Sequence, residues 1–308
     1  MQIMSLITAL PGAAAQGLIW GIMAIGVYIT FRILDIADLT VDGTLCTGGA
    51  VCIMMMLSGH NVWVSMLAAT GAGLLAGLAT GIFHTFMGIP AILAGILTQL
   101  SLYSINLKIM GKANQAINVD KFNLLVSLRR VKGVALTQNT LFIVAIMIII
   151  LIAVLYWFFG TELGCSLRAT GCNPSMSRAQ GINTDFCKVL GLMISNGLVA
   201  LSSALLAQYQ GFADVNMGRG AIVIGLAAVI IGEAIFSRIF RNFALRLLAV
   251  AFGSILYYLV LQTVIWMGID TDLLKMLSAL VVAVFLAVPY WKGKYFAKPA
   301  KRGGKNNA

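Results

Sequence analysis

Long runs of apolar residues, separated by short polar segments, fill the chain from near its start to about residue 291. A helix needs ~20 predominantly apolar residues to cross a bilayer, and it satisfies its own backbone hydrogen bonds there. We therefore predict an all-α polytopic membrane protein with about nine transmembrane helices. The predicted spans are residues 12–31, 43–58, 62–83, 89–107, 140–160, 187–208, 220–236, 244–267 and 273–291.

The second and seventh predicted spans are short for a full crossing, and the third contains a regular row of glycines. Short spans at matching places in two halves of a chain mark the pathway in some transporters. Gly73, Gly77 and Gly81 are spaced four residues apart and therefore lie on one side of a helix. Small residues in such a row let helices approach closely, so we predict a packing surface there.

The composition agrees with a membrane protein. Of 308 residues, 60% are hydrophobic and only 10% are charged, whereas a soluble domain carries about 25% charged residues. The net charge of +11 does not indicate nucleic-acid binding, because the basic residues form no single stripe with stacking aromatic residues. The five cysteines form no CxxC pair and there are only two histidines, so we expect no metal site.

Basic residues predict the orientation, because cytoplasmic segments of membrane proteins are enriched in lysine and arginine. The tail 292–308 is rich in both, so we expect a basic cytoplasmic tail after a single transmembrane domain over residues 1–291. Counting back through nine spans places the N-terminus outside, segment 161–186 in the cytoplasm and segment 111–139 outside. Segment 111–139 is basic too, but long translocated segments escape the rule. Alternation around Gly133 predicts an external hairpin within it.

Two stretches of the chain are similar to each other. Residues 17–55 align with residues 193–231, and "ADLT" at Ala37 matches "ADVN" at Ala213. The identities are near chance in so biased a composition, but both tetrapeptides lie between a long and a short predicted span. The two copies begin five crossings apart and so point in opposite directions. This predicts an inverted repeat, an architecture found in transporters.

Polar residues at the entrances to the two short spans are candidates for lining a translocation pathway. Charge is costly inside a membrane and therefore faces a cavity or a partner. Helix capping is the alternative, because aspartate and threonine are good caps at helix N-termini. The candidates are Asp38, Thr40 and Asp42 at the first entrance, and Asp214 and Asn216, followed by Arg219, at the second.

Glu233 lies near the predicted cytoplasmic end of the seventh span, and Arg238 and Arg241 follow within two turns. A structural ion pair is the interpretation that we favour. A proton-coupling carboxylate is the alternative, but a secondary transporter would need more such groups inside the membrane.

The polar segment 161–186 contains the pattern of a short exposed helix. In "NPSMSRAQGI", Asn173 can cap the helix, Pro174 suits its first position and Gly181 can end it. Serine and alanine give this helix a slim surface. Docking into the groove of a partner requires such a surface, although an ordinary amphipathic loop is the alternative.

This segment resembles the cytoplasmic coupling segment of the branched-chain amino acid permease superfamily of ABC importers. The usual form there is G-x-x-x-R-A, a few polar residues, and A-x-x-x-G-I-N. "GVYITFRILDIADLTVDGTLCTGGAV" resembles the junction of the first two spans in that superfamily, and "RRVKGVALTQNTLFIVAIMI" resembles its external hairpin. The stretches "IPAILAGILTQLSLYSINLKIMG" and "GLAAVIIGEAIF" resemble a narrower group labelled as tryptophan or tyrosine transport permeases.

The resemblance covers about nine-tenths of the chain and implies a set of partners. They are a second permease copy in a two-fold core, two ABC ATPase subunits and an extracytoplasmic substrate-binding protein. The location implied is the bacterial cytoplasmic (inner) membrane. Cys172 and Asn173 stand where the superfamily often has acidic residues, so the resemblance does not carry over the polar contacts at these two positions. The residues implied to couple to the ATPase are Arg168, Ala169, Cys172, Asn173, Pro174, Ala179 and Gly181.

The chain has no GxxxxGK[ST] motif, so ATP and Mg²⁺ are expected on the partner ATPase and no cofactor on this chain. We predict a non-catalytic permease subunit that imports a small solute by alternating access. The resemblance favours an amino acid as substrate. Three alternatives stay open: a secondary transporter using Glu233 and Asp38, an ABC permease for a nucleoside or sugar, and a scaffold that transports nothing.

Overall fold

The computed structural model describes residues 2–119, 121–122, 124–131, 139–236, 240, 242–267 and scattered positions between 273 and 287. Seven helices in this part of the chain are long and apolar enough to cross a membrane. The predicted class, an all-α polytopic membrane protein, is confirmed. Most of the ninth predicted span, the basic tail, and Arg238 and Arg241 lie outside the described residues.

The first eight predicted spans all coincide with helices of the structure. α9 has 16 residues, which confirms that the seventh is short. The long helices are α1 (Gln2–Tyr28), α2 (Thr40–Leu57), α3 (Val62–Thr85), α4 (Ala91–Met110), α5 (Thr140–Gly160), α8 (Thr184–Gln210) and α10 (Phe243–Trp266). The shorter elements are the π-helical turn η1 (Ile29–Ile33), the 3₁₀ turn η2 (Leu128–Val131), α6 (Glu162–Cys172), α7 (Pro174–Ala179), α9 (Ala221–Phe236), β1 (Asn114–Ala116) and β2 (Phe212–Asp214).

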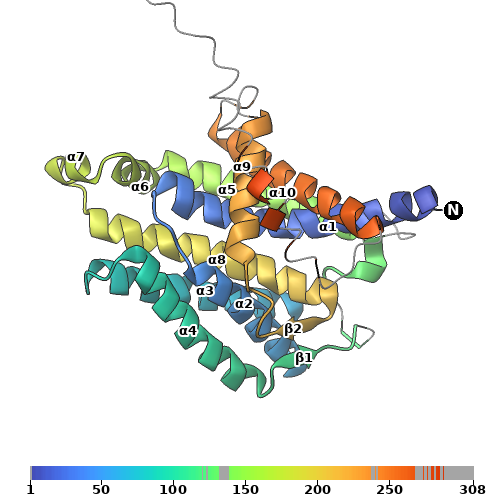
Figure 1. Ribbon diagram of the computed structural model, residues 1–308. Coiled ribbons are helices and arrows are strands. Elements are labelled where there is room, and N and C mark those ends of the chain that lie inside the picture. Colours follow the sequence, from blue (N-terminus) through green and yellow to red (C-terminus); the bar gives the residue numbers. More distant parts are fainter. Residues whose placement is uncertain are drawn as a thin grey trace, which may run out of the picture.

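Three helices form the centre of the bundle. α1, α2 and α8 are mostly buried, whereas α4 and α5 are mostly exposed. α8 runs from one end of the bundle, where α6 and α7 lie, to the other end, where β1 pairs with β2 (Figure 1). Both ends of α8 are capped. At its start the side chain of Asn183 accepts from the backbone N–H of Phe186, and at its end Gly211 adopts a φ of +80°. The bundle therefore has two distinct ends joined by one buried helix.

The glycine row of α3 lies in the most extensive helix–helix contact of the described part of the bundle. A Cβ atom at Gly73 would overlap the backbone of Asn196, and one at Gly77 would overlap the backbone of Leu192. Gly81 faces Val189 one turn further along. The predicted packing surface is thus confirmed, and its partner is α8. Lipid tails are as apolar as leucine, so such close contacts supply much of the attraction between helices.

The external hairpin predicted around Gly133 is wrong in its first arm. Leu128–Val131 form the 3₁₀ turn η2, and residues 132–138 lie outside the described residues. Side chains satisfy the backbone here in place of a partner strand: Gln208 Oε1 accepts from the N–H of Leu125, and Arg130 donates to the carbonyl of Leu124. The strand that the structure describes in segment 111–139 is β1. It pairs antiparallel with β2, so that Asn114 lies opposite Asp214 and Ala116 lies opposite Phe212.

Candidate functional site

The short helix predicted in segment 161–186 is present as α7. Asn173 Oδ1 accepts from the N–H of Met176 at 3.0 Å, and Pro174 occupies the first turn. Gly181 adopts a φ of +83° just after the helix. α7 lies at the far end of the bundle, away from the packed helices (Figure 1). Apart from Ser177, its residues are exposed, so one end of the molecule presents a slim free helix.

Two contacts hold α7 in a defined position. Arg178 donates from Nε to Thr184 Oγ1 at 2.8 Å and lies 3.6 Å from an Asp185 carboxylate oxygen, which ties α7 to the start of α8. On the other side, a Cβ at Gly171 would overlap the carbonyl of Ile33, so α6 rests directly on the end of η1. Motion of α7 is therefore linked to α8 through side chains and to η1 and α1 through α6.

The residues predicted to couple to an ATPase do not all point the same way. Cys172, Asn173, Pro174, Ala179 and Gly181 are exposed around α7. Ala169 is half-buried, and the guanidinium of Arg168 lies 5.7 Å from the centre of the Phe243 ring, toward α10. The exposed group is available to a partner, whereas Arg168 contacts a neighbouring helix.

The carboxylate of Asp38 lies in a buried polar network at the centre of the bundle. It is 2% exposed, and it accepts from the N–H of Thr40 at 2.9 Å and from Asn196 Nδ2 at 2.7 Å. Asn196 Oδ1 in turn accepts from Thr44 at 2.7 Å. Burial raises the pKa of the Asp38 carboxyl, while the hydrogen bonds from Thr40 and Asn196 oppose that shift. This network joins the segment before α2 to α8.

Thr40 extends the network to α3 and α4. Its hydroxyl lies 2.7 Å from that of Thr80, which donates to Thr98 at 2.9 Å. All three threonines are buried. Four helices therefore meet through hydrogen bonds at one depth, where each unpaired polar group would be costly.

Asp42 caps a helix, but not its own. Its two carboxylate oxygens accept from the backbone N–H groups of Gly220 and Ile222, each at 3.0 Å. These groups belong to the start of α9, where unpaired N–H groups and the helix dipole favour a negative charge. Asp42 is thus a cap, as the alternative for this residue held, but of α9 rather than of α2, and it fixes α2 against α9.

Asp42 also borders a cavity of about 380 Å³ between α2, α4 and the turn before α9. Arg219, on that turn, is exposed and supplies a positive charge to the same cavity. Asn106 is fully buried at its wall, and its Oδ1 has no hydrogen-bond partner among the described residues. Tyr103 and Gln99 complete the polar lining. The cavity therefore has one acidic and one basic side chain in its lining.

Asp214 and Asn216 lie outside this cavity. Asp214 is partly exposed on β2; its carboxylate accepts from the N–H of Asn216 at 2.6 Å and from Asn114 Nδ2 at 3.1 Å. Asn216 is exposed. The structure therefore brings only Asp42 and Arg219 of the predicted pathway candidates together at a cavity.

Glu233 forms the expected ion pair, with a partner that the sequence did not indicate. Its Oε1 lies 3.1 Å from Nε of Arg32, 201 residues earlier. Other residues were missed as well: Asn196, Thr80 and Thr98 of the buried network, and Asn106 of the cavity. Their only signal is a polar residue within an apolar helix, which does not show which helix it faces.

Comparison with known proteins covers nearly the whole chain. A family model described as "Branched-chain amino acid transport system / permease component" matches residues 10–288. A tyrosine transport system permease protein of Clostridioides difficile is 40% identical over 272 residues, 88% of each chain. A fructose import permease protein of Bifidobacterium longum is 26% identical, covering 80% of this chain and 68% of the relative.

Two further comparisons concern an uncharacterised relative and the fold. A protein of Rickettsia prowazekii is 37% identical, over 92% of this chain and 96% of the relative. The solved structure of PsaBC from Streptococcus pneumoniae in complex with Fab matches 96% of this chain and 98% of that chain, with a TM-score of 0.55. Its identity is 17%, so this likeness supports the fold alone.

Proposed function

This chain belongs to the permease family of branched-chain amino acid transport systems, and we propose that it is the membrane subunit of an ATP-driven importer for an amino acid. An ABC transport system in general includes an ATPase and a substrate-binding protein. We propose two ATPase subunits and a homodimer of this chain, because a closed two-fold pair is the simplest symmetric assembly. Tyrosine is the first substrate to test, since the relative named for it is 40% identical.

The exposed helix α7 is the observation that carries the proposal. A helix of six residues that is solvent-exposed on nearly all sides buries too little surface to be maintained by packing alone. Its cap, its proline and its tie to Asp185 hold it rigid without a covering element. Such a helix is suited to bind in a groove of a partner protein, and we propose that this partner is the ATPase.

The mechanism that we propose transmits ATPase closure through α6 and α8. Displacement of α7 acts on α8 through Arg178 and on η1 through Gly171. Both α8 and α1 reach the opposite end of the bundle, so a small shift at α7 can change access at the other end. Transport then requires only that ATP and the loaded binding protein stabilise different states of the permease, one open to the cytoplasm and one open to the outside.

The cavity beside Asp42 is the part of the pathway that we assign to the solute. An amino acid carries an ammonium and a carboxylate, and the cavity offers Asp42 and Arg219 as opposite charges. Asp38 and Thr40 then act as supports, because their bonds hold α2 in place from within the bundle.

The ion-coupled alternative has less support. Both carboxylates that it needs are engaged, Glu233 with Arg32 and Asp38 with Asn196. The family relationship also favours an ATPase as the energy source. A sugar as substrate finds support only in more distant relatives, such as the fructose permease at 26% identity.

The coupling assignment is tested with Ala179→Arg in proteoliposomes that contain the ATPase and the binding protein. A large charged side chain on α7 should prevent docking, so radiolabelled tyrosine uptake per ATP hydrolysed should fall about ten-fold or more. A matched control is Ala113→Arg, the same change at an exposed position at the opposite end of the bundle. Normal uptake by the Ala179 variant would show that α7 is not the docking helix.

A further inference from the structure

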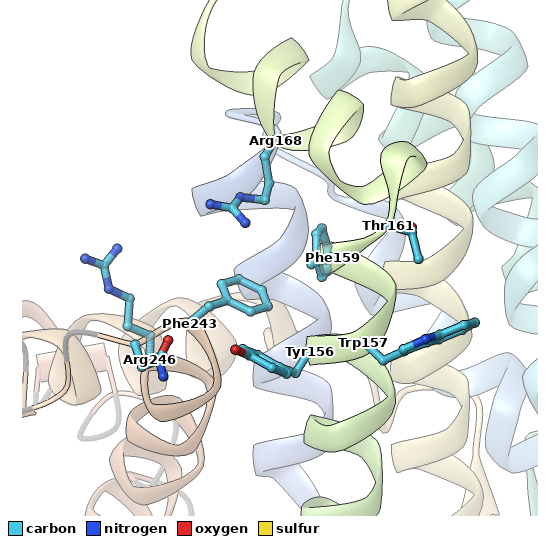
Figure 2. A pocket seen from close by; sticks show the side chains of 9 residues that line it. Tyr156, Trp157, Phe159, Thr161, Arg168, Phe243 and Arg246 are labelled. Atoms are coloured by element: carbon cyan, nitrogen blue, oxygen red, sulfur yellow. The ribbon is translucent and has the colours of Figure 1, made fainter.

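A second cavity, of about 700 Å³, opens where α5, α6 and α10 meet (Figure 2). Tyr156 and Trp157 line it from the last turns of α5, Arg168 from α6, and Phe243 and Arg246 from the first turn of α10. In Figure 2 the side chains of Arg168 and Arg246 extend toward the same side of the cavity, and the rings of Phe243 and Tyr156 lie below them. Two cations from different helices therefore share one space.

Neither arginine is paired with a carboxylate within the part of the chain that the structure describes. The ion pairs there join Arg32 to Glu233 and Arg178 to Asp185. Arg168 and Arg246 are both exposed, so their charges are not buried by the protein. The cavity thus carries an uncompensated positive charge.

The surroundings of each guanidinium leave donors free for a ligand. Arg168 stacks over the ring of Phe243 at 5.7 Å, which orients the group but uses none of its N–H donors. Arg246 interacts with the hydroxyl of Tyr28, and Glu233, which lines a neighbouring pocket together with Arg246, is already bonded to Arg32. A guanidinium with free N–H groups binds phosphate oxygens well, because its planar fork matches their spacing.

The aromatic residues place this cavity at the level of lipid headgroups. α5 is the most apolar of the seven long helices in the described part of the chain, and little of it is buried. Trp157 is 71% exposed and Tyr156 49% exposed at the end of this helix. Tryptophan and tyrosine concentrate at the boundary between the hydrocarbon core and water. A bilayer crossed by α5 would therefore bring its phosphates to the level of Arg168 and Arg246.

We propose that this cavity binds the phosphate headgroup of an anionic phospholipid. Basic pockets between transmembrane helices bind such headgroups on the cytoplasmic side of membranes. The assignment to the cytoplasmic leaflet rests on the proposed function, because α6 continues into α7. The bound lipid would hold α6 against α10 and so steady the base of the coupling segment.

The test uses the purified full-length chain in detergent and needs no ATPase, so its result is independent of the proposed transport function. Equimolar phosphatidylglycerol and phosphatidylcholine with identical acyl chains are added, and native mass spectrometry counts the lipids retained. We expect a clear preference for phosphatidylglycerol. Each juxtamembrane arginine contributes a factor of about five to binding of anionic lipid, so Arg168→Gln/Arg246→Gln should lower the preference about twenty-five-fold.

Controls separate a defined site from general charge attraction. Lys188→Gln removes one charge from the start of α8, at the same end of the bundle, and should leave the preference unchanged. Arg168→Lys/Arg246→Lys keeps both charges and should retain most of it. If the glutamine variant does not fold, Arg246→Gln alone replaces it and should lower the preference about five-fold.

Three results would overturn the proposal. The first is equal retention of both lipids by the unaltered chain, and the second is an unchanged preference in the glutamine variant. The third is displacement of phosphatidylglycerol by millimolar inorganic phosphate or glycerol 3-phosphate, which would show that the cavity takes a free phosphate.

Discussion

Asp38 and Asp214 occupy corresponding places in the two similar stretches of the chain, yet their surroundings differ completely. Each aspartate accepts a hydrogen bond from the backbone N–H two residues later, at 2.9 Å for Asp38 and 2.6 Å for Asp214. Asp38 is buried and bonded to Asn196 of α8, whereas Asp214 is partly exposed on a short strand. Similar local sequences therefore form the same turn, and tertiary packing decides how much each turn contributes to the stability of the bundle.

The same two stretches of the chain form the predicted inverted repeat. In both stretches a long helix is followed by a non-helical segment and a shorter helix, α1 before α2 and α8 before α9. The shared turns agree with a repeat, but they say nothing about the relative direction of the two halves. The inversion stays a prediction.

The largest effect is expected from Asp38→Ala. It removes one acceptor of Asn196 Nδ2 and the acceptor of the N–H of Thr40 in a buried site, and it leaves a cavity. We expect a loss of about 3 kcal/mol in the free energy of unfolding, measured by denaturant titration in mild detergent. A loss below about 1 kcal/mol would mean that the buried network does not hold the bundle together.

A double-mutant cycle sharpens the contrast. Asp38→Ala combined with Asn196→Ala should show a coupling energy of about 1–2 kcal/mol, because the two groups are bonded at 2.7 Å in a buried site. The same cycle on Asp214 and Asn114, bonded at 3.1 Å near the surface, should give a value close to zero. Equal coupling in the two cycles would remove the distinction between the turns.

Asp42→Ala should have an intermediate effect. It removes the cap of α9, which costs about 1–2 kcal/mol in other helices, and it takes the negative charge from the proposed solute cavity. Tyrosine uptake should therefore fall more than stability does. Asp42→Asn is the matched variant, since it keeps one acceptor for α9 but loses the charge. Unimpaired uptake with Asn would exclude an ionic role for this residue.

The smallest effect is expected from Asp214→Asn. An asparagine can still accept from the N–H of Asn216, and the position is partly exposed. The change in the free energy of unfolding should stay within about 0.5 kcal/mol, as for most surface substitutions. A larger loss in the same denaturant titration would show that the pairing of β1 with β2 stabilises the whole bundle.

The sequence predicts what depends on local patterns. The lengths of the apolar runs predicted the positions of eight helices. Asn173, Pro174 and Gly181 predicted α7, because caps and turns depend only on neighbouring residues. Contacts between distant segments were not predictable in this way. Nothing near Glu233 indicates Arg32, and the alternation around Gly133 does not reveal that the strand of this segment pairs with residues 212–214.

The proposed function requires an ATPase docked on α7. We would test this by purifying the chain from its native membrane in a gentle detergent and identifying every protein that stays bound. We predict a stoichiometric subunit with a GxxxxGK[ST] motif, which Ala179→Arg releases and Ala113→Arg retains. Reproducible recovery of the folded chain without any such subunit would contradict it.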